Sequence, residues 1–463
     1  MNEKLNNILS EMGITLTDDQ HKVISTVDDK QHTMVIGRPG VGKSLLIDVL
    51  KRYYGDRLVV GSTTGISNQR LFNGHGGSGS MHRVFDLPIG LHNNSHRKKV
   101  SSFCSNLLSK NHNLEYILID EAGFLLNSDY LELMRSRIQR FNRKHRDRPK
   151  RDIKLILFGD LLQLPVFFDQ TSEKYMRDQY GSPYFFKSDV FSEMNFKTVS
   201  INEVKRTDDK TFKAALDAMR YGQEDRYPKL CQWLNSIMYK PEIPDGLPLI
   251  TCWNKEADKV NQQMLESNPN KLWTYHARVT GKYDIKNNPV GAEVSVKVGA
   301  LVMTLVNDND NGSYNNGSMG EVTMCVDDGV YVKMFHTQEE VFIGFHTFDQ
   351  HESVEKGTEV GDDGKTRPKM VNDLVGTCEI IPARLCYATS IHKAQGDNIL
   401  TDCVVDLGKW GFNKSNSFGE SLSYVALSRF SNPRNVYLKY PITPKHIKVN
   451  QEILEWVLEN MNE

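Results

Sequence analysis

Residues 33–44 read Thr-Met-Val-Ile-Gly-Arg-Pro-Gly-Val-Gly-Lys-Ser, a short apolar run followed by a glycine-rich loop that ends in Lys43 and Ser44. The pattern G-x-x-x-x-G-K-S is that of a phosphate-binding loop, and apolar residues at helical spacing follow it over 45–50. The sequence therefore predicts a buried strand, a loop whose backbone N–H groups surround phosphate oxygens, and a helix that begins at the loop.

The loop predicts ATP and Mg²⁺ as ligands. Lys43 is expected to reach the β and γ phosphates, and the Ser44 hydroxyl is expected to ligate magnesium. The residues expected to hold the nucleotide are Gly37, Arg38, Pro39, Gly40, Val41, Gly42, Lys43 and Ser44.

A second apolar strand, residues 116–119, ends in Asp120 and Glu121. Paired carboxylates at a strand end are what a magnesium-dependent phosphate hydrolase requires. Asp120 is expected to hold the metal, and Glu121 to orient and deprotonate the attacking water. A kinase does not need the second carboxylate, so the pair favours hydrolysis.

A third strand, residues 155–158, leads into Gly-Asp-Leu-Leu-Gln-Leu-Pro at 159–165. This string resembles motif III of superfamily 1 helicases, and the resemblance implies that Gln163 senses the γ-phosphate. Upstream, residues 16–20 resemble the Q motif of the same helicases, in which the glutamine, here Gln20, reads adenine. Capping of a helix is the alternative role for Gln20. Together, the three strands predict an α/β core with a parallel sheet.

The second half of the chain contains further strand patterns at 247–251, 383–389, 403–406 and 435–438 but no second phosphate loop. Three strings in this half resemble helicase motifs IV, V and VI: Asn-Glu-Val-Lys-Arg at 202–206, Ser-Ile-His-Lys-Ala-Gln-Gly at 390–396 and Ser-Tyr-Val-Ala-Leu-Ser-Arg at 423–429. The last two strings resemble superfamily 1B, the group of phage Dda, RecD-type and yeast petite-integration-frequency helicases. The resemblance spans roughly residues 16–438.

The resemblance implies roles for further residues. Arg206 and Arg429 are expected to act as arginine fingers on the γ-phosphate, with a surface salt bridge as the alternative for each. Gly396 is expected at the nucleotide. The residues expected to bind DNA are Thr63, Thr64, His82, Ser390, His392 and Lys393.

The resemblance also implies four structural parts. The fold class is α/β, with two RecA-like parallel-sheet domains, a small 1B insertion and an SH3-like β insertion, 2B. The expected ranges are 1–72 with 114–197 for domain 1A, 73–113 for 1B, 198–272 with 379–463 for 2A, and 273–378 for 2B. The apolar candidates for a strand-separating wedge in 1B are Phe85, Leu87, Pro88 and Ile89, with packing as the alternative. The helix at 453–458 is expected to pack on the second core.

Composition limits the other possibilities. The net charge of −1 excludes a histone-like polycation, so a nucleic-acid site must be a local groove. Seven scattered cysteines without a C-x-x-C pair predict reduced thiols rather than a zinc site or a disulfide framework.

No run of about 18 apolar residues is present, and no targeting signal opens the chain, so a cytoplasmic location is expected. The compact arrangement resembles a viral or bacterial accessory helicase.

These features predict an ATP-dependent helicase that moves 5′→3′ on single-stranded DNA and unwinds duplex with little sequence specificity. Its expected partners are single-stranded DNA and junctions of single and double strands. Replication or recombination proteins are candidate partners, no membrane is involved, and a monomer is expected to function. Two alternatives stay open from the residues alone: an RNA helicase or RNP remodeller, and a nucleic-acid loader that uses ATP only as a switch.

Overall fold

The computed structural model describes residues 3–63, 79–80, 85, 87, 91, 113–144, 152–203, 207–285, 288, 290–306, 308, 313–314, 318–335, 337–360, 366–395, 399, 401–413 and 417–461. The chain divides into two compact units. The first contains residues 1–245, 250–252 and 390–463, and the second contains residues 246–249 and 253–389. Each unit has its own hydrophobic clusters.

A six-stranded sheet forms the first core of the first unit, in the order β3-β2-β4-β5-β1-β6. Every pairing in it is parallel. The carboxyl ends of β4, β5 and β1 are therefore neighbours, and the loops that follow them lie at one edge of the sheet. The strands are β1 (Thr33–Gly37), β2 (Leu58–Ser62), β3 (Gly79–Ser80), β4 (Tyr116–Asp120), β5 (Lys154–Gly159) and β6 (Lys197–Ile201).

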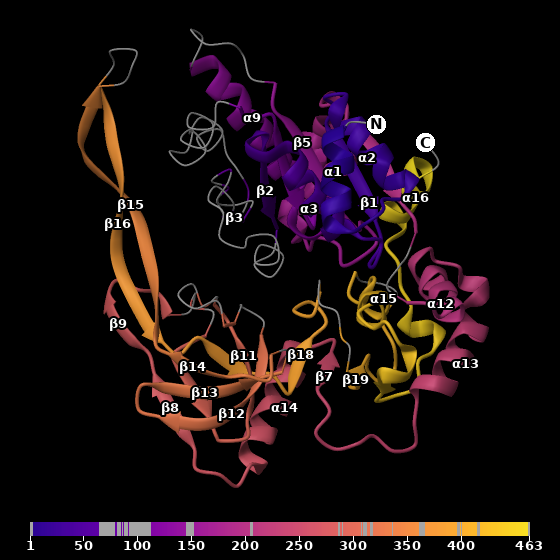
Figure 1. The fold of residues 1–463 in the computed structure, drawn as a ribbon, viewed down its shortest axis with the longest axis vertical. Coiled ribbons are helices and arrows are strands. Elements are labelled where there is room, and N and C mark those ends of the chain that lie inside the picture. The colour runs from indigo at the N-terminus through magenta and orange to yellow at the C-terminus, as the bar shows by residue number, and fades with distance from the viewer. Residues whose placement is uncertain are drawn as a thin grey trace. The chain divides into compact units, whose positions relative to one another are not determined.

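Helices cover both faces of this sheet (Figure 1). Side chains of a strand alternate between faces. Val35 and Leu118 accordingly pack with α1 (Glu3–Met12), α2 (Asp18–Asp28) and α3 (Lys43–Tyr54). Met34, Ile36 and Ile117 face the opposite cluster. The helices and turns near that cluster are α8 (Ala122–Leu125), α9 (Ser128–Lys144), α10 (Gln170–Tyr180), η2 (Phe185–Lys187) and α11 (Asp189–Glu193).

A four-stranded sheet, in the order β18-β7-β19-β20, forms the second core together with helices α12, α13 and α15. Its strands are β7 (Leu249–Thr251), β18 (Ala388–Ser390), β19 (Cys403–Asp406) and β20 (Val436–Leu438). The helices are α12 (Lys210–Arg220), α13 (Tyr227–Met238) and α15 (Leu422–Leu427). Short 3₁₀ turns lie at Gly55–Arg57, Glu224–Arg226, Pro433–Asn435 and Pro444–His446.

The second unit is built mostly of antiparallel strands. A five-stranded sheet has the order β14-β13-β12-β11-β17, β10 pairs with β8, and β9 joins the hairpin of β15 and β16. The hairpin extends beyond the five-stranded sheet as a long ribbon (Figure 1). The elements are α14 (Asn254–Ser267), β8 (Trp273–His276), β9 (Arg278–Gly281), β10 (Glu293–Val296), β11 (Leu301–Thr304), β12 (Met319–Val326), β13 (Gly329–Met334), β14 (Glu340–Gly344), β15 (His346–Val360), β16 (Thr366–Ile380) and β17 (Ala383–Leu385).

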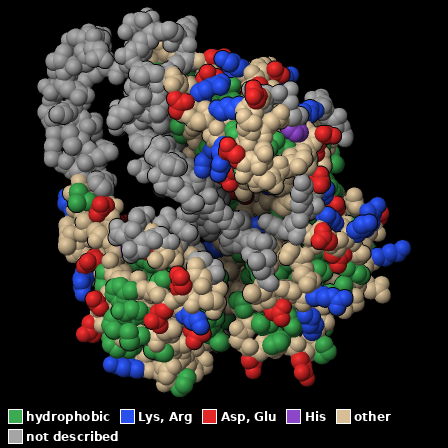
Figure 2. Space-filling view, in the orientation of Figure 1, with side chains coloured by type: hydrophobic (Ala, Val, Ile, Leu, Met, Phe, Trp, Pro, Cys, Tyr) green, Lys and Arg blue, Asp and Glu red, His purple; other side chains and the backbone are tan. Residues whose placement is uncertain are grey.

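The surface carries no single-sign field on the face drawn in Figure 2. Lys and Arg side chains are interspersed with Asp and Glu over the first unit, in keeping with the net charge of −1. Hydrophobic side chains gather on the face of the second unit at the lower left of the view. Within the described ranges, no helix is both long enough and apolar enough to cross a membrane.

Most of the predicted elements are confirmed, including the strands β1, β4, β5, β7, β19 and β20. The six cysteines in the described part of the chain are buried free thiols, as predicted; Cys104 lies outside it. Phe85 and Leu87 are buried in the first core, which supports packing rather than a wedge for these two residues, and the other two candidates, Pro88 and Ile89, lie outside the described residues.

The expected packing of the C-terminal helix is wrong. In α16 (Gln451–Asn460), Ile453, Leu454 and Val457 join the hydrophobic cluster of the first core, and the Trp456 ring lies 4.8 Å from that of Phe186. The apolar spacing of a helix defines the face that is buried but not the surface that covers it.

Candidate nucleotide and nucleic-acid site

The phosphate loop joins β1 to α3 in the conformation that its glycines permit. Gly40 and Gly42 both have φ of 83°, a left-handed value that side chains disfavour. The Lys43 ammonium donates hydrogen bonds to the carbonyls of Gly37 (2.5 Å) and Arg38 (3.3 Å). The cation therefore lies over the loop, where phosphate oxygens would be bound.

Gln20 links the predicted Q motif to this loop. Its Oε1 accepts a hydrogen bond from the Thr17 backbone N–H at 3.0 Å, and its Nε2 donates to the Val41 carbonyl at 3.2 Å. Thr17 is the N-cap of α2, so the capping role is confirmed. A primary amide still has one N–H and one lone pair after these two bonds, which leaves the adenine contact as a prediction.

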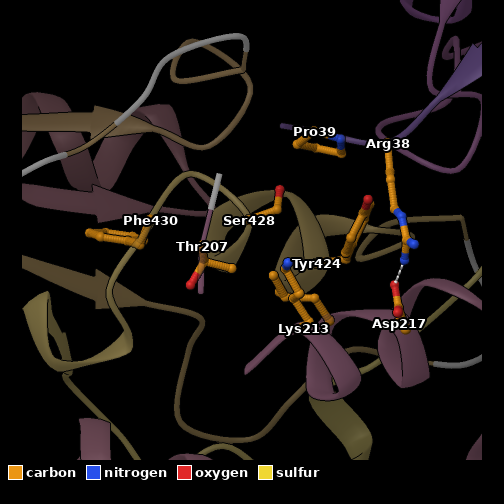
Figure 3. A pocket seen from close by; sticks show the side chains of 9 residues that line it. Arg38, Pro39, Thr207, Lys213, Asp217, Tyr424, Ser428 and Phe430 are labelled. Carbon is orange, nitrogen blue, oxygen red and sulfur yellow. Dashed lines mark hydrogen bonds and ion pairs between the residues drawn. The ribbon is translucent and has the colours of Figure 1, made fainter. Parts of the chain in front are cut away.

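Arg38 points away from the loop, toward the second core (Figure 3). Its guanidinium forms an ion pair with Asp217 on α12 and donates to the Asn202 carbonyl at 2.8 Å. This arrangement joins the phosphate loop to α12. The sequence predicted Arg38 at the phosphates and gave no signal for its partner, which lies 179 residues further along the chain.

A pocket lies beside Arg38, between the phosphate loop and the helices α12 and α15 (Figure 3). Its lining includes the Arg38–Asp217 ion pair and the Lys213 ammonium, while the Tyr424 and Ser428 hydroxyls donate to Asp160 Oδ2 and the Val425 carbonyl. Sequence reasoning missed most of this lining, because a helical pattern does not reveal which face meets a ligand. The lining residues are Arg38, Pro39, Thr207, Lys213, Leu216, Asp217, Tyr424, Ser428 and Phe430.

Asp120 and Glu121 lie at the carboxyl end of β4. Asp120 is buried, and its Oδ1 accepts a hydrogen bond from the Glu121 N–H at 2.9 Å. Glu121 has φ of 53°, the left-handed region that is uncommon for residues other than glycine. Such a conformation in a residue other than glycine is found most often at functional sites.

Thr63 supports Glu121 in this conformation. Its hydroxyl donates to the Glu121 carbonyl at 2.6 Å, and its N–H donates to the Asp120 carbonyl at 3.2 Å. Thr63 was predicted to contact DNA. The buried hydroxyl proton is already donated here, and a DNA phosphate offers only acceptors, so a phosphate contact would require this hydrogen bond to break.

Gln163 and its neighbour Asp160 follow β5. The Gln163 Nε2 lies 3.5 Å from Asp160 Oδ2, while its Oε1 is buried without a hydrogen-bond partner. Burial opposes the charge of Asp160, but the Arg220 guanidinium outweighs it and the pKa of the carboxyl is lowered. The free amide oxygen can accept a hydrogen bond from a water or a hydroxyl group, whereas a phosphate would have to be bound through Nε2.

Arg429 lies two residues beyond the end of α15 and is buried. Its Nε donates to the Val425 carbonyl and its Nη2 to the Ser428 hydroxyl, both at 3.0 Å. Ser428 and Tyr424 line the pocket beside the phosphate loop. Arg429 itself is not among the lining residues, so its role as an arginine finger stays a prediction.

The predicted nucleic-acid residues of the second core lie at the ends of neighbouring strands. Ser390 ends β18, and its buried hydroxyl has no hydrogen-bond partner. Thr251, at the end of β7, also has a buried hydroxyl without a hydrogen-bond partner. Its carbonyl accepts a hydrogen bond from the Ile391 N–H at 2.9 Å. His392 and Lys393 are exposed. Thr251 was not predicted; its position at the end of a buried strand was the available signal.

Four predicted site residues lie outside the described part of the chain: Thr64, His82, Arg206 and Gly396. Among the described residues, no group of three or more His, Cys, Asp and Glu side chains is arranged to hold a metal. A magnesium ion that binds together with a nucleotide needs fewer protein ligands, because phosphate oxygens and water molecules complete its coordination shell. Asp120 and Ser44 offer the carboxylate and hydroxyl oxygens that such an ion prefers.

Comparisons with known proteins agree with this geometry. ATP-dependent DNA helicase Pif1 of Campylobacter jejuni is 26% identical over 428 residues, which are 86% of this chain and 87% of that protein. Pif1 helicase from Bacteroides in complex with ADP-AlF3 and ssDNA matches with a TM-score of 0.74 and 24% identity, covering 97% of this chain and 98% of that one. A structure of two coordinating Pif1 helicases at forked dsDNA matches with a TM-score of 0.72 and 22% identity, at the same coverage. No protein-family model matches the chain. The α/β fold with parallel sheets and the resemblance to superfamily 1B helicases, expected from the motifs, are confirmed, and the 1B and 2B insertions stay predictions.

Proposed function

We propose that the chain is an ATP-dependent DNA helicase that translocates 5′→3′ on single-stranded DNA and unwinds duplex. The proposal depends on one observation: three residues with expected roles in hydrolysis lie at the ends of neighbouring strands, and two helices of the second core face the phosphate loop beside them. Lys43, Asp120 and Gln163 follow β1, β4 and β5, which are neighbours in one sheet, while α12 and α15 face the phosphate loop. The relatives that share this fold are named ATP-dependent DNA helicases.

Each group has a role in hydrolysis. Lys43 stabilises the β and γ phosphates, and Glu121 takes the proton of the attacking water. Gln163 and Arg429 contact the γ-phosphate from the two cores, so turnover depends on how the cores are placed. Ser44 and Asp120 would hold Mg²⁺, which neutralises charge on the phosphates.

The part of the nucleic-acid track that the described residues support runs over the strand ends of the second core. Ser390 and Thr251 offer buried hydroxyls without partners, and His392 and Lys393 are exposed next to them. Contacts of this kind hold phosphates and carry no sequence information, so binding has little sequence specificity. We propose four parts, 1A, 1B, 2A and 2B, with the ranges predicted from the motifs, except that α16 belongs with the first core and β17 with the antiparallel sheet of the second unit. Buried reduced thiols fit a cytoplasmic location.

ATPase assays test the proposal directly. Turnover is measured with single-stranded DNA, with single-stranded RNA of the same sequence, and without nucleic acid, and Lys43→Ala serves as the inactive control. We expect stimulation by DNA well above that by RNA, and loss of turnover in the control. Equal stimulation by RNA would favour an RNA helicase, whereas stoichiometric ATP binding without turnover would favour a switch.

A further inference from the structure

Trp410, in the loop that follows β19, is one of the most exposed large apolar side chains in the described part of the chain. Its exposed fraction is 79%. One exposed aromatic side chain is ordinary on a protein surface. Trp410 differs from such a side chain in the backbone that holds it, in the charges beside it and in the edge of the sheet at which it lies.

The loop is fixed on both sides of the Trp410 ring. Before the ring, the Gly408 carbonyl accepts a hydrogen bond from His446 Nε2 at 2.9 Å. After the ring, the Phe412 N–H donates to the Lys445 carbonyl at 2.9 Å, and the Phe412 side chain is buried. The indole is therefore exposed on a backbone that does not need to be ordered when a ligand binds, which lowers the entropy cost of binding.

Gly411 allows the loop to lie directly against the 3₁₀ turn at Pro444–His446. Its φ is 79°, and a Cβ atom at this position would lie only 2.6 Å from Lys445 Cβ. A residue with a side chain would be strained in this conformation and would also meet Lys445. The close approach places Lys445 beside the loop that carries Trp410.

The charges beside the ring are positive. The Lys409 ammonium lies 5.0 Å from the centre of the Trp410 ring. Lys409 and Lys445 are both exposed, and neither forms an ion pair with a carboxylate of the described residues. These two lysines are therefore available to an anionic ligand.

The carboxylates of this region are already engaged. Asp406 Oδ2 accepts from Lys439 Nζ at 2.7 Å, and Glu420 Oε2 accepts from Asn450 Nδ2 at 2.9 Å. Neither carboxylate offsets the charge of the two exposed lysines by a direct contact.

The loop lies at the edge of the four-stranded sheet where the predicted nucleic-acid residues lie. Ser390 and Thr251 end β18 and β7, and β19 is the next strand after β7 in this sheet. Asp406 ends β19. Burial and then the Asp406 charge raise the pKa of Cys252, the residue that follows β7. The two strands therefore end beside each other, and the loop with Trp410 continues the row of strand ends.

An exposed indole beside two cations fits single-stranded nucleic acid. Every base has a flat apolar face that can stack on an aromatic ring, and ammonium groups attract the phosphates. A protein partner could also cover an aromatic side chain, but lysine is depleted in protein interfaces. The position beside Ser390 and Thr251 favours nucleic acid as the ligand.

We propose that Trp410 is a stacking platform for one base of a single-stranded nucleic acid, with Lys409 and Lys445 as contacts for the adjoining phosphates. The inference rests on the proposed function and deepens it, because it extends the nucleic-acid track to the loop after β19. Stacking does not depend on the identity of the base, so the platform adds affinity without sequence specificity.

Fluorescence anisotropy with two labelled strands of equal length tests the platform. One strand is a dT oligonucleotide, and the other is an abasic strand with the same sugar–phosphate backbone. Trp410→Ala should bind the dT strand about tenfold more weakly than the wild-type chain does and bind the abasic strand nearly as well. Trp410→Phe should recover most of the loss, because a phenyl ring also stacks on a base.

Tyr239→Ala is the matched control. Tyr239 is 46% exposed and precedes a lysine, but Lys240 Nζ donates to the Arg434 carbonyl, two residues before β20 begins. Because β19 and β20 are parallel, Tyr239 lies at the sheet edge opposite to the loop after β19. Tyr239→Ala should therefore bind both strands as the wild-type chain does.

The salt dependence of binding tests the phosphate contacts. Lys445→Gln should lower the slope of log K against log salt concentration by about 0.7, whereas Trp410→Ala should leave the slope unchanged. An unchanged slope in Lys445→Gln would contradict the phosphate contact.

Three outcomes would overturn the platform and leave the proposed function intact: unchanged binding of the dT strand by Trp410→Ala, equal losses by this variant on both strands, or an equal loss by Tyr239→Ala. A wild-type chain that binds the dT strand in the expected way but lacks DNA-stimulated ATPase would overturn the proposed function instead.

Discussion

Glu121 combines an uncommon backbone conformation with the position of a general base. Glutamine keeps the shape of the side chain and its left-handed backbone but cannot accept the proton of a water. We expect Glu121→Gln to bind ATP and DNA with nearly wild-type affinity and to lose about 10²–10⁴-fold in kcat. Single-turnover hydrolysis and equilibrium binding measure the two quantities. Turnover close to wild type would remove Glu121 from its assigned role.

Thr63 offers a second test at the scale of one side chain. Thr63→Val keeps the shape but loses the hydrogen bond to the Glu121 carbonyl. We expect a loss of about tenfold in kcat at saturating DNA, with little change in DNA affinity, and recovery in Thr63→Ser. The opposite pattern, weaker DNA binding with unchanged kcat at saturation, would restore Thr63 to the DNA-binding set.

Single residues at strand ends were the most predictable part of the site. Lys43, Asp120 and Gln163 each follow an apolar run, and parallel strands bring such ends to one edge of a sheet. The partners of Arg38 and Asp160 were not predictable. Asp217 and Tyr424 lie on helices of the second core, and no local pattern encodes a contact across so many residues.

At the scale of elements, the start of β5 depends on a histidine in the segment before β1. His32 Nδ1 accepts a hydrogen bond from the Leu155 N–H at 2.9 Å, so the ring is neutral when this bond is formed. Burial, and then Lys154, lower the pKa of His32 from 6.5 to about 4. Between pH 6.5 and about pH 4, His32 is therefore protonated in the unfolded chain and neutral in the folded chain.

The sign of the pH dependence follows from this difference. The contribution of His32 to the free energy of unfolding is fully present above pH 6.5. It declines as the pH falls toward about 4 and changes no further below that pH. The loss approaches about 3 kcal/mol. In His32→Asn the amide oxygen can replace Nδ1 as the acceptor, so the decline over this window should shrink in urea-unfolding curves. His276→Asn, on an exposed side chain of the second unit, is the control. An unchanged decline in His32→Asn would assign the acid sensitivity to other groups.

The periodicity of apolar residues predicted most helices and strands, but it did not predict which elements pack against one another. The pattern at 383–389 predicted strands of the second core, whereas β17 pairs with β11 in the antiparallel sheet. The helix α16 packs on the first core for the same reason: an apolar face can be covered by either hydrophobic surface. Element type is a local property of the chain, and element placement is not.

At the scale of the whole molecule, a helicase needs a direction: the relative motion of its two cores must move it along the nucleic-acid strand one way only. Composition and spacing do not report direction, because polarity depends on which core holds the strand more firmly when the nucleotide site closes. The resemblance of motifs V and VI to superfamily 1B supplies the expectation, since members of that group move 5′→3′.

We therefore expect duplexes with a 5′ single-stranded tail to be unwound and duplexes with only a 3′ tail to remain intact. Fluorescence-detected strand separation under matched ATP and protein concentrations measures both, with a blunt duplex and Lys43→Ala as controls. Unwinding of 3′-tailed duplexes alone would contradict the polarity while leaving the hydrolytic site as assigned.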